Sequence, residues 1–203
     1  MKTQMRFQKI LMLVTLVIAA LCFVYSIAFL TGGLGNVPYY IPLEGDVYVD
    51  KINGSNFFNA SQKFVSTLTV LSIVLIVLCV LLFFTQCNKR RNYYITNYII
   101  IGAVVIFALV VAIYAFVGIG NSQNLFFNDI AWESGTNNGL NYADQYNKNY
   151  PINKTSTNFA LGYVLFSIVI VDAVAMVLNL VWKILLMKGE KALLQEGFVK
   201  EVA

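Results

Sequence analysis

Residues 64–84 spell FVSTLTVLSIVLIVLCVLLFF, a run that contains no charged side chain. A helix needs roughly 20 predominantly apolar residues to cross the hydrocarbon core of a bilayer. Three further stretches of the 203-residue chain have this length and character, namely 10–30, 98–117 and 159–186. Because 59% of the residues are hydrophobic and are gathered in these runs, the sequence predicts an all-α membrane protein. We expect a single domain, a bundle of four transmembrane helices.

The segments between the predicted helices differ in length and polarity. Residues 31–63 and 118–158 are long and polar, whereas residues 85–97 are short and basic. The sequence therefore predicts two helical hairpins, joined by the short segment and carrying two long outer loops. Residues 189–203 form a tail, for which we expect either a frayed end or a short amphipathic stretch on the membrane surface.

Lysine and arginine are unevenly divided between the two sides of the predicted bundle. Basic residues are retained on the cytoplasmic side of a membrane. Ten of the 14 basic residues fall on one side: Lys2, Arg6, Lys9, Lys89, Arg90, Arg91, Lys183, Lys188, Lys191 and Lys200. The pattern predicts a plasma-membrane protein with both termini cytoplasmic and both long loops extracellular. The net charge of +4 follows mostly from this asymmetry, so we expect no nucleic-acid partner.

Cysteine and histidine usage argues against catalysis. Cys22 and Cys79 fall within predicted helices and Cys87 in the cytoplasmic turn, so no disulfide is expected in the outer loops. The chain has no histidine, no CxxC pair, no phosphate-binding glycine loop and no GxSxG motif. We therefore expect no enzymatic activity, no metal site and no cofactor.

The two halves of the chain resemble each other weakly. Residues 28–36 (AFLTGGLGN) end the first predicted helix, and residues 115–121 (AFVGIGN) end the third. The second helix contains SIVL at 72–75, and the fourth contains SIVI at 167–170. These matches suggest a parallel duplication of one hairpin, although apolar helices also resemble one another by chance. Both stretches contain glycines, which are typical of helix C-termini.

Asp172 interrupts the apolar pattern near the middle of the fourth helix. Such a group costs about 2.5–3.5 kcal/mol at the centre of a membrane helix and usually faces the bundle interior. Asn179 lies on the same helix face, seven residues later. The first helix carries a stripe of small and polar residues at spacings of four, three and four: Thr15, Ala19, Cys22 and Ser26. The simplest packing sets this stripe against the face that bears Asp172.

Two roles are compatible with Asp172. The carboxyl group can be a protonatable or cation-attracting group on a permeation path, or it can lock helix contacts or bind a partner subunit. The sequence suggests no embedded basic partner for it, which favours the structural role. Trp182, Lys183 and Lys188 are instead expected to anchor the end of the fourth helix at the membrane interface.

The second outer loop is the segment most suited to binding a ligand. Trp132, Tyr142 and Tyr146 lie there among many amide side chains. Rings that stack and amides that hydrogen-bond suit a carbohydrate or peptide, and they suit equally well a small folded cap packed on the first loop. An extracellular ligand is therefore left open.

Short segments at the helix ends carry one further signal: Arg6–Ile10, Phe84–Gln86, Arg91–Tyr94, Asn97–Tyr98 and Trp182–Lys183. They resemble segments of uncharacterised four-helix integral membrane proteins of low-GC Gram-positive bacteria. The resemblance covers the helices and the cytoplasmic turn but not the outer loops. It implies the same topology and membrane location, and it implies no particular activity.

Two functions remain as expectations from the sequence. The first is a non-catalytic structural or auxiliary subunit in the bilayer, in a homo-oligomer or in a larger membrane complex such as a transporter. The alternative is an oligomeric channel or small transporter with Asp172 on its permeation or coupling path.

Overall fold

The computed structural model describes residues 2–37, 54–86, 92–130, 132, 136–137 and 140–202. Of these, residues 136–137, 140–145 and 193–202 are described by their backbone alone. Residues 38–53 of the first outer loop, Cys87 and the basic turn at residues 89–91 lie outside the described residues.

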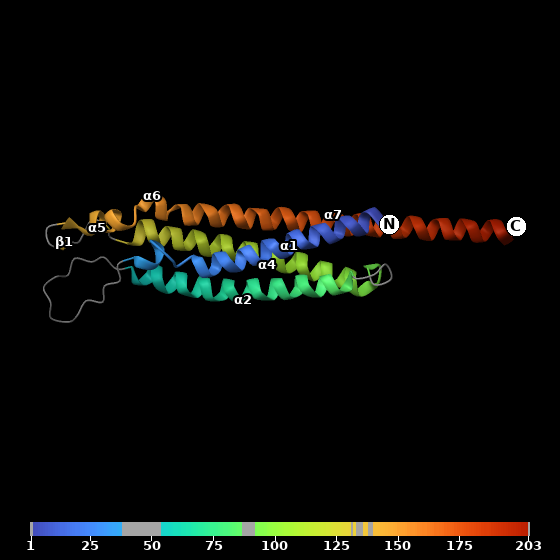
Figure 1. Cartoon of the computed structure of the whole chain (residues 1–203), viewed down its shortest axis with the longest axis horizontal. Coiled ribbons are helices and arrows are strands. Elements are labelled where there is room, and N and C mark those ends of the chain that lie inside the picture. The colour runs from blue at the N-terminus through green and yellow to red at the C-terminus, as the bar shows by residue number, and fades with distance from the viewer. Residues whose placement is uncertain are drawn as a thin grey trace. The chain divides into compact units, whose positions relative to one another are not determined.

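Four long helices form most of the structure (Figure 1). They are α1 (Lys2–Ala28), α2 (Ser55–Thr85), α4 (Ile95–Asn124) and α7 (Thr157–Val202). Each contains a stretch long and apolar enough to cross a membrane. The predicted fold class is therefore confirmed: the chain is an all-α membrane protein built as a bundle of four helices.

The chain forms two compact units, and each long helix contributes a segment to both of them. The first unit contains Met1–Ala19, Val74–Val110 and Ile168–Ala203. The second unit contains Ala20–Ile73 and Val111–Ser167. Each unit therefore has its own core, to which α1, α2, α4 and α7 all contribute.

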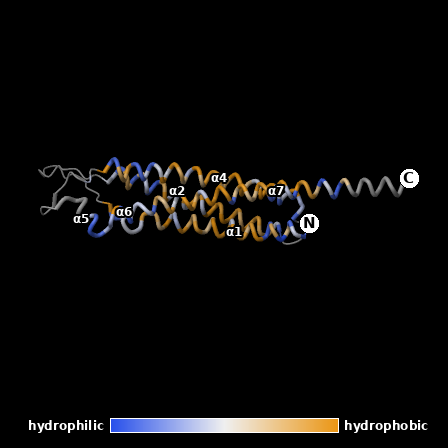
Figure 2. The backbone as a smooth tube through the Cα atoms, turned by 90° about the horizontal axis from the view of Figure 1, so that it is seen from above, coloured by the Kyte–Doolittle hydropathy of each residue, from blue (hydrophilic) through white to orange (hydrophobic). Residues whose placement is uncertain are grey.

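Buried residues recur every three or four positions along the long helices, which gives each helix one inward-facing stripe. In α4 and the turn that follows it, the stripe contains Asn97, Ile101, Val104, Ala108, Val111, Ala115, Ile119, Ser122 and Phe126. Branched apolar side chains such as Ile99, Ile106 and Ile113 cover the outer faces and are exposed. Figure 2 shows the resulting apolar colouring along all four helices. Polar groups inside and apolar groups outside are the arrangement that a bilayer favours.

Several short elements accompany the long helices in the second unit. They are the 3-10 helix η1 (Leu34–Asn36), the π-helical turn η2 (Leu125–Asp129), the strands β1 (Thr136–Asn137) and β2 (Leu140–Asn141), and the helices α5 (Tyr142–Asn149) and α6 (Ile152–Thr155). The two strands pair antiparallel, with Thr136 opposite Asn141. The second outer loop is therefore largely structured.

The helices extend beyond the apolar runs from which they were predicted. α1 begins at Lys2 rather than near residue 10, and α4 continues through Gly118 to Asn124. α7 continues through Gly189 to Val202 instead of fraying. A hydropathy pattern detects the lipid-facing part of a helix, whereas backbone hydrogen bonds continue as long as no residue interrupts them.

Glycines occupy different conformations at the two exits that resemble each other in sequence. Gly32, just after α1, has a φ of 63°, in the left-handed region that favours glycine and that commonly ends a helix. Gly118 instead lies inside α4, where a Cβ atom would overlap the ring of Phe64. The prediction that the third helix ends at Gly118 is therefore wrong, because this glycine permits close helix packing. The duplication remains a hypothesis from the sequence.

Alanine at Gly118 should lower the free energy of unfolding by about 1–3 kcal/mol, because the added methyl group overpacks the contact with Phe64. Gly102 is a matched control on the same helix, since a Cβ there would meet no atom within 4 Å. Alanine at Gly102 should be neutral or stabilise the helix by up to about 1 kcal/mol. Unfolding by dodecyl sulfate in mixed micelles, followed by circular dichroism, measures both changes. Equal effects would contradict the close approach at Gly118.

Candidate intramembrane polar site

Lys183 is a fully buried lysine in the first unit. Its Nζ donates a hydrogen bond to Oδ1 of Asn97 on α4. The same Nζ lies 4.4 Å from the ring centroid of Tyr98 and 5.4 Å from that of Tyr93. An ammonium group over an aromatic face is attracted by the negative charge of the ring face. A carbonyl oxygen and two rings, rather than a carboxylate, therefore hold this buried charge.

Amide side chains extend this site by hydrogen bonds to neighbouring helices. Gln8 of α1 donates from Nε2 to Oδ1 of Asn97 at 3.0 Å. Gln4 donates from Nε2 to Oε1 of Gln8 at 2.9 Å and to Oδ1 of Asn179 at 3.1 Å. Asn97 donates from Nδ2 to Oγ1 of Thr85 at 2.8 Å. α1, α2, α4 and α7 are thus all joined by side-chain hydrogen bonds.

We call this set the buried amide network; its members are Gln4, Gln8, Thr85, Tyr93, Asn97, Asn179 and Lys183. Gln4, Gln8, Asn97 and Asn179 are each at most 1% exposed. Hydrogen bonds between helices within a membrane contribute about 0.6–2 kcal/mol each. These bonds fix the register of the helices, since a shift of α1, α4 or α7 breaks more than one of them and a shift of α2 breaks the bond from Asn97 to Thr85.

Tyr93 closes the network just before α4. Its hydroxyl group donates to Oε1 of Gln4 at 2.9 Å. Burial raises the pKa of Tyr93 above its ordinary value, and the nearby Tyr98 and Glu190 raise it further. The hydroxyl group therefore keeps its proton at neutral pH and remains a donor to Gln4.

One member of the network and two buried amides close to it in sequence have polar atoms that no described residue satisfies. Nδ2 of Asn179 is buried without a hydrogen-bond partner in the described part of the chain, and so are Nδ2 of Asn92 and both polar atoms of the Gln86 amide. A buried donor left unpaired costs about 1–3 kcal/mol. Asn179 thus has a free N–H group that can donate to a water molecule or an ion.

Asp172 is also buried in the first unit, at 7% exposure. Thr15 of α1 is a side-chain hydrogen-bond partner of Asp172. Cys79 of α2 lies near the Asp172 carboxyl group. The Thr15 hydroxyl group already donates to the carbonyl oxygen of Leu11 at 3.0 Å.

The face of α7 that carries Asp172 also carries the α7 members of the network. Asp172, Met176, Asn179 and Lys183 follow one another at spacings of four, three and four, and all four are buried. The expectation that Lys183 anchors the helix at the surface is therefore wrong. Trp182 does lie at the surface, at 37% exposure, where its ring packs on Phe7 with a centroid distance of 5.8 Å.

The remainder of the predicted α1 stripe lies in the second unit. Cys22 and Ser26 are fully buried. Ser26 donates to the carbonyl oxygen of Phe23 at 2.7 Å, and its hydroxyl oxygen lies 2.9 Å from Oγ1 of Thr69 on α2. This part of the stripe therefore pairs with α2, whereas Thr15 pairs with α7 in the first unit.

The rings of the second outer loop pack on one another. Trp132 and Tyr146 lie 4.8 Å apart by ring centroid, and both pack on Phe126. The indole N–H donates to the carbonyl oxygen of Phe126 at 2.9 Å, and the Tyr146 hydroxyl group donates to that of Gly33 at 2.7 Å. Burial raises the pKa of Tyr146, as does Tyr150, while a hydrogen bond to Thr155 opposes this.

These contacts form a folded cap in which Tyr146 is only 5% exposed. The polar atoms of Trp132 and Tyr146 therefore both donate to backbone carbonyl oxygens of this chain. Tyr142 is the first residue of α5, and its side chain lies outside the described residues.

The sequence interpretation missed most of the network. Gln4 and Gln8 precede the predicted first helix, and Lys183 was assigned to the interface. A signal was nevertheless present, because Gln4, Gln8 and Thr15 continue the spacing of the α1 stripe toward the N-terminus.

Comparison of the chain with family models, with curated proteins and with solved structures finds no match. Within the described residues, no three histidine, cysteine, aspartate or glutamate side chains gather to hold a metal ion.

Proposed function

We propose that this protein is a non-catalytic membrane subunit that assembles with copies of itself or within a larger membrane complex. The observation that carries the proposal is the hydrogen bonding of the buried polar side chains to one another. The amide groups and Lys183 bond to one another across four helices, and Asp172 bonds to Thr15. Such an interior locks one helix arrangement and supports a structural role.

The proposed setting is the plasma membrane, with both termini on the cytoplasmic side. The distribution of basic residues supports this orientation, because ten lie on the side of the termini and four on the other. The buried amide network then lies near the cytoplasmic ends of the helices.

The outer faces of the helices support a role in association. They carry exposed branched side chains, and Gly102 on α4 has open space where a Cβ atom would stand. In lipid, a small residue lets another helix approach closely. A second chain can approach this face without disturbing the interior.

The alternative is a channel or small transporter, and one specific arrangement favours it. Asp172, Asn179 and Lys183 follow one another along one face of α7, and Nδ2 of Asn179 is unpaired among the described residues. A row of groups that can exchange protons or attract ions is typical of a conduction path.

Mass measurement in mild detergent tests the subunit proposal. The expected result is a complex whose mass is a multiple of the chain mass, or one that contains a second membrane protein. A monomer alone, recovered from the native membrane without a partner, would overturn the proposal.

Flux into liposomes separates the two functions. We expect no proton or cation flux above that of empty liposomes, either for the wild type or for Asp172→Asn. Asp129→Asn is a matched control, since Asp129 is exposed and accepts a hydrogen bond from Asn56 at 3.0 Å in the second unit. Flux that is lost in Asp172→Asn and retained in Asp129→Asn would establish the alternative.

A further inference from the structure

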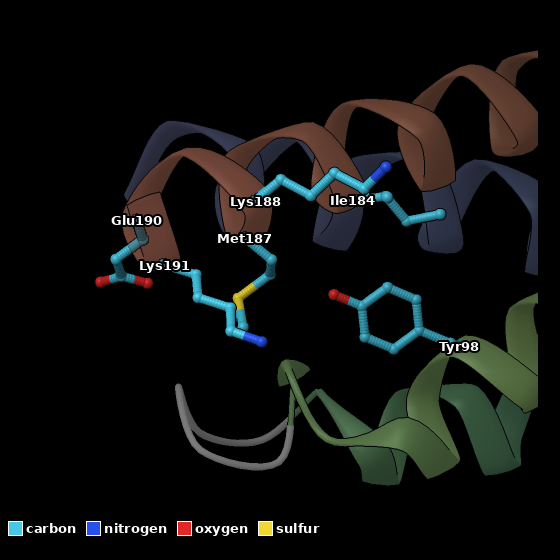
Figure 3. Close-up of a pocket in the computed structure, with 6 residues that line it drawn as sticks. All are labelled: Tyr98, Ile184, Met187, Lys188, Glu190 and Lys191. Atoms are coloured by element: carbon cyan, nitrogen blue, oxygen red, sulfur yellow. The ribbon is translucent and has the colours of Figure 1, made fainter. Parts of the chain in front are cut away.

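A groove of about 450 Å³ opens beside the buried amide network in the first unit (Figure 3). One wall is the ring of Tyr98 on α4. The other wall is a face of α7 whose residues lie within two turns of one another: Ile184, Met187, Lys188, Glu190 and Lys191. The surface of the groove is mostly apolar, and three of the residues that line it are charged.

The position of the groove matches the boundary between hydrocarbon and headgroups. Along α7, the exposed side chains change from apolar ones such as Leu185 to charged ones from Lys188 onward. Tyrosine is enriched at this depth, because its ring is apolar and its hydroxyl group is polar. Ile184 and Met187 thus lie at the acyl chains, and Lys191 lies at the headgroups.

The charges favour an anionic occupant. Lys188 and Lys191 are exposed. The residues that line the groove thus include two positive charges and one negative charge, that of Glu190. Figure 3 shows the Glu190 carboxylate pointing away from Tyr98, while the side chain of Lys191 extends toward the space in front of the Tyr98 hydroxyl group. An amine and a phenol that face the same space can both donate to a phosphate oxygen.

The Tyr98 ring, which forms one wall of the groove, also contacts the buried Lys183. The ammonium group of Lys183 lies 4.4 Å from the centroid of this ring. This contact orients the ring and places a positive charge near the groove. One wall of the groove is therefore held by the buried amide network.

We propose that this groove binds an anionic glycerophospholipid. Its phosphate group is held by Lys191 and the Tyr98 hydroxyl group, Lys188 adds a second positive charge to the groove, and an acyl chain lies along Ile184 and Met187. Basic pockets between membrane helices on the cytoplasmic side are suited to such headgroups, because that leaflet is rich in anionic lipid. The inference rests on membrane insertion and on the proposed orientation, but it does not depend on the subunit role.

Native mass spectrometry of the purified full chain tests the site. The detergent-solubilised protein is titrated with phosphatidylglycerol, with phosphatidylcholine of identical acyl chains, and with free glycerophosphate. We expect the wild type to retain phosphatidylglycerol in preference to the zwitterionic lipid. Replacing both Lys188 and Lys191 by glutamine should weaken retention of phosphatidylglycerol roughly tenfold or more.

Lys2→Gln with Lys9→Gln is the matched control, because it removes two exposed charges elsewhere in the first unit. The control should retain the wild-type affinity. Equal affinity for the two lipids, or equal weakening in the control, would overturn the proposal. Competition by free glycerophosphate as strong as that by lipid would instead identify a soluble anion as the occupant and would also overturn it. A monomer that still selects phosphatidylglycerol would leave the lipid site standing while the subunit role fails.

Discussion

Leucine in place of Asn97 should destabilise the protein by about 3–5 kcal/mol. Asn97 accepts hydrogen bonds from Gln8 and Lys183 and donates one to Thr85. Leucine has a similar volume but no polar atom, so the substitution leaves a buried ammonium group with only aromatic rings as neighbours. Unfolding by dodecyl sulfate in mixed micelles measures the loss.

Lys183→Met provides the control for this prediction. Removing the charged group also removes its need for an acceptor, so this variant should lose much less stability than Asn97→Leu. The double variant should therefore be more stable than the sum of the two single effects predicts. Strict additivity would show that the two side chains are not coupled, and it would contradict the central bond of the network.

Alanine in place of Phe126 should cost about 3–5 kcal/mol, because truncation leaves a cavity at the centre of the aromatic cap. The ring of Phe126 is fully buried, and its centroid lies 5.6 Å from that of Phe57, 5.3 Å from that of Trp132 and 5.8 Å from that of Phe159. Removing it takes away packing partners from three segments of the second unit at once. The measurement is again the free energy of unfolding in mixed micelles.

Phe127→Ala is the neighbouring control, since that ring is 42% exposed and should lose less stability on truncation. The fluorescence of Trp132 gives a local readout in a variant that carries phenylalanine at position 182, the site of the other tryptophan. Phe126→Ala should shift this emission to the red as water enters the cap. Unchanged emission together with unchanged stability would contradict a packed cap.

The four helices were predictable from hydropathy because a membrane helix must be apolar over most of its surface. The ends were not predictable in the same way. Gln4 and Gln8 look like solvated residues in a hydropathy window, yet they lie inside the first unit, where other amides satisfy them. Hydropathy measures the cost of a polar group in lipid and contains no information on its partner.

Asp172 stood out because it is a lone charge in an apolar run, and the spacing of the α1 stripe pointed to Thr15 as a neighbour. Lys183 did not stand out, because a lysine after a tryptophan near the end of a helix is typical of an interface anchor. What buries it is a set of residues distant in sequence, Asn97 and Tyr98 on α4 and Tyr93 just before it. Only tertiary structure brings these together.

The buried amide network has a consequence for the order of assembly. Translation delivers α1, α2 and α4 to the bilayer before α7, so Gln8, Thr85 and Asn97 are in place before Lys183 arrives. The acceptor of Lys183, Oδ1 of Asn97, is therefore already in the bilayer when α7 is inserted. A nascent chain that halts before α7 lacks both Lys183 and Asn179, which leaves Gln4 and Asn97 without their partners on that helix. Completion of the network thus distinguishes a finished chain from an arrested one.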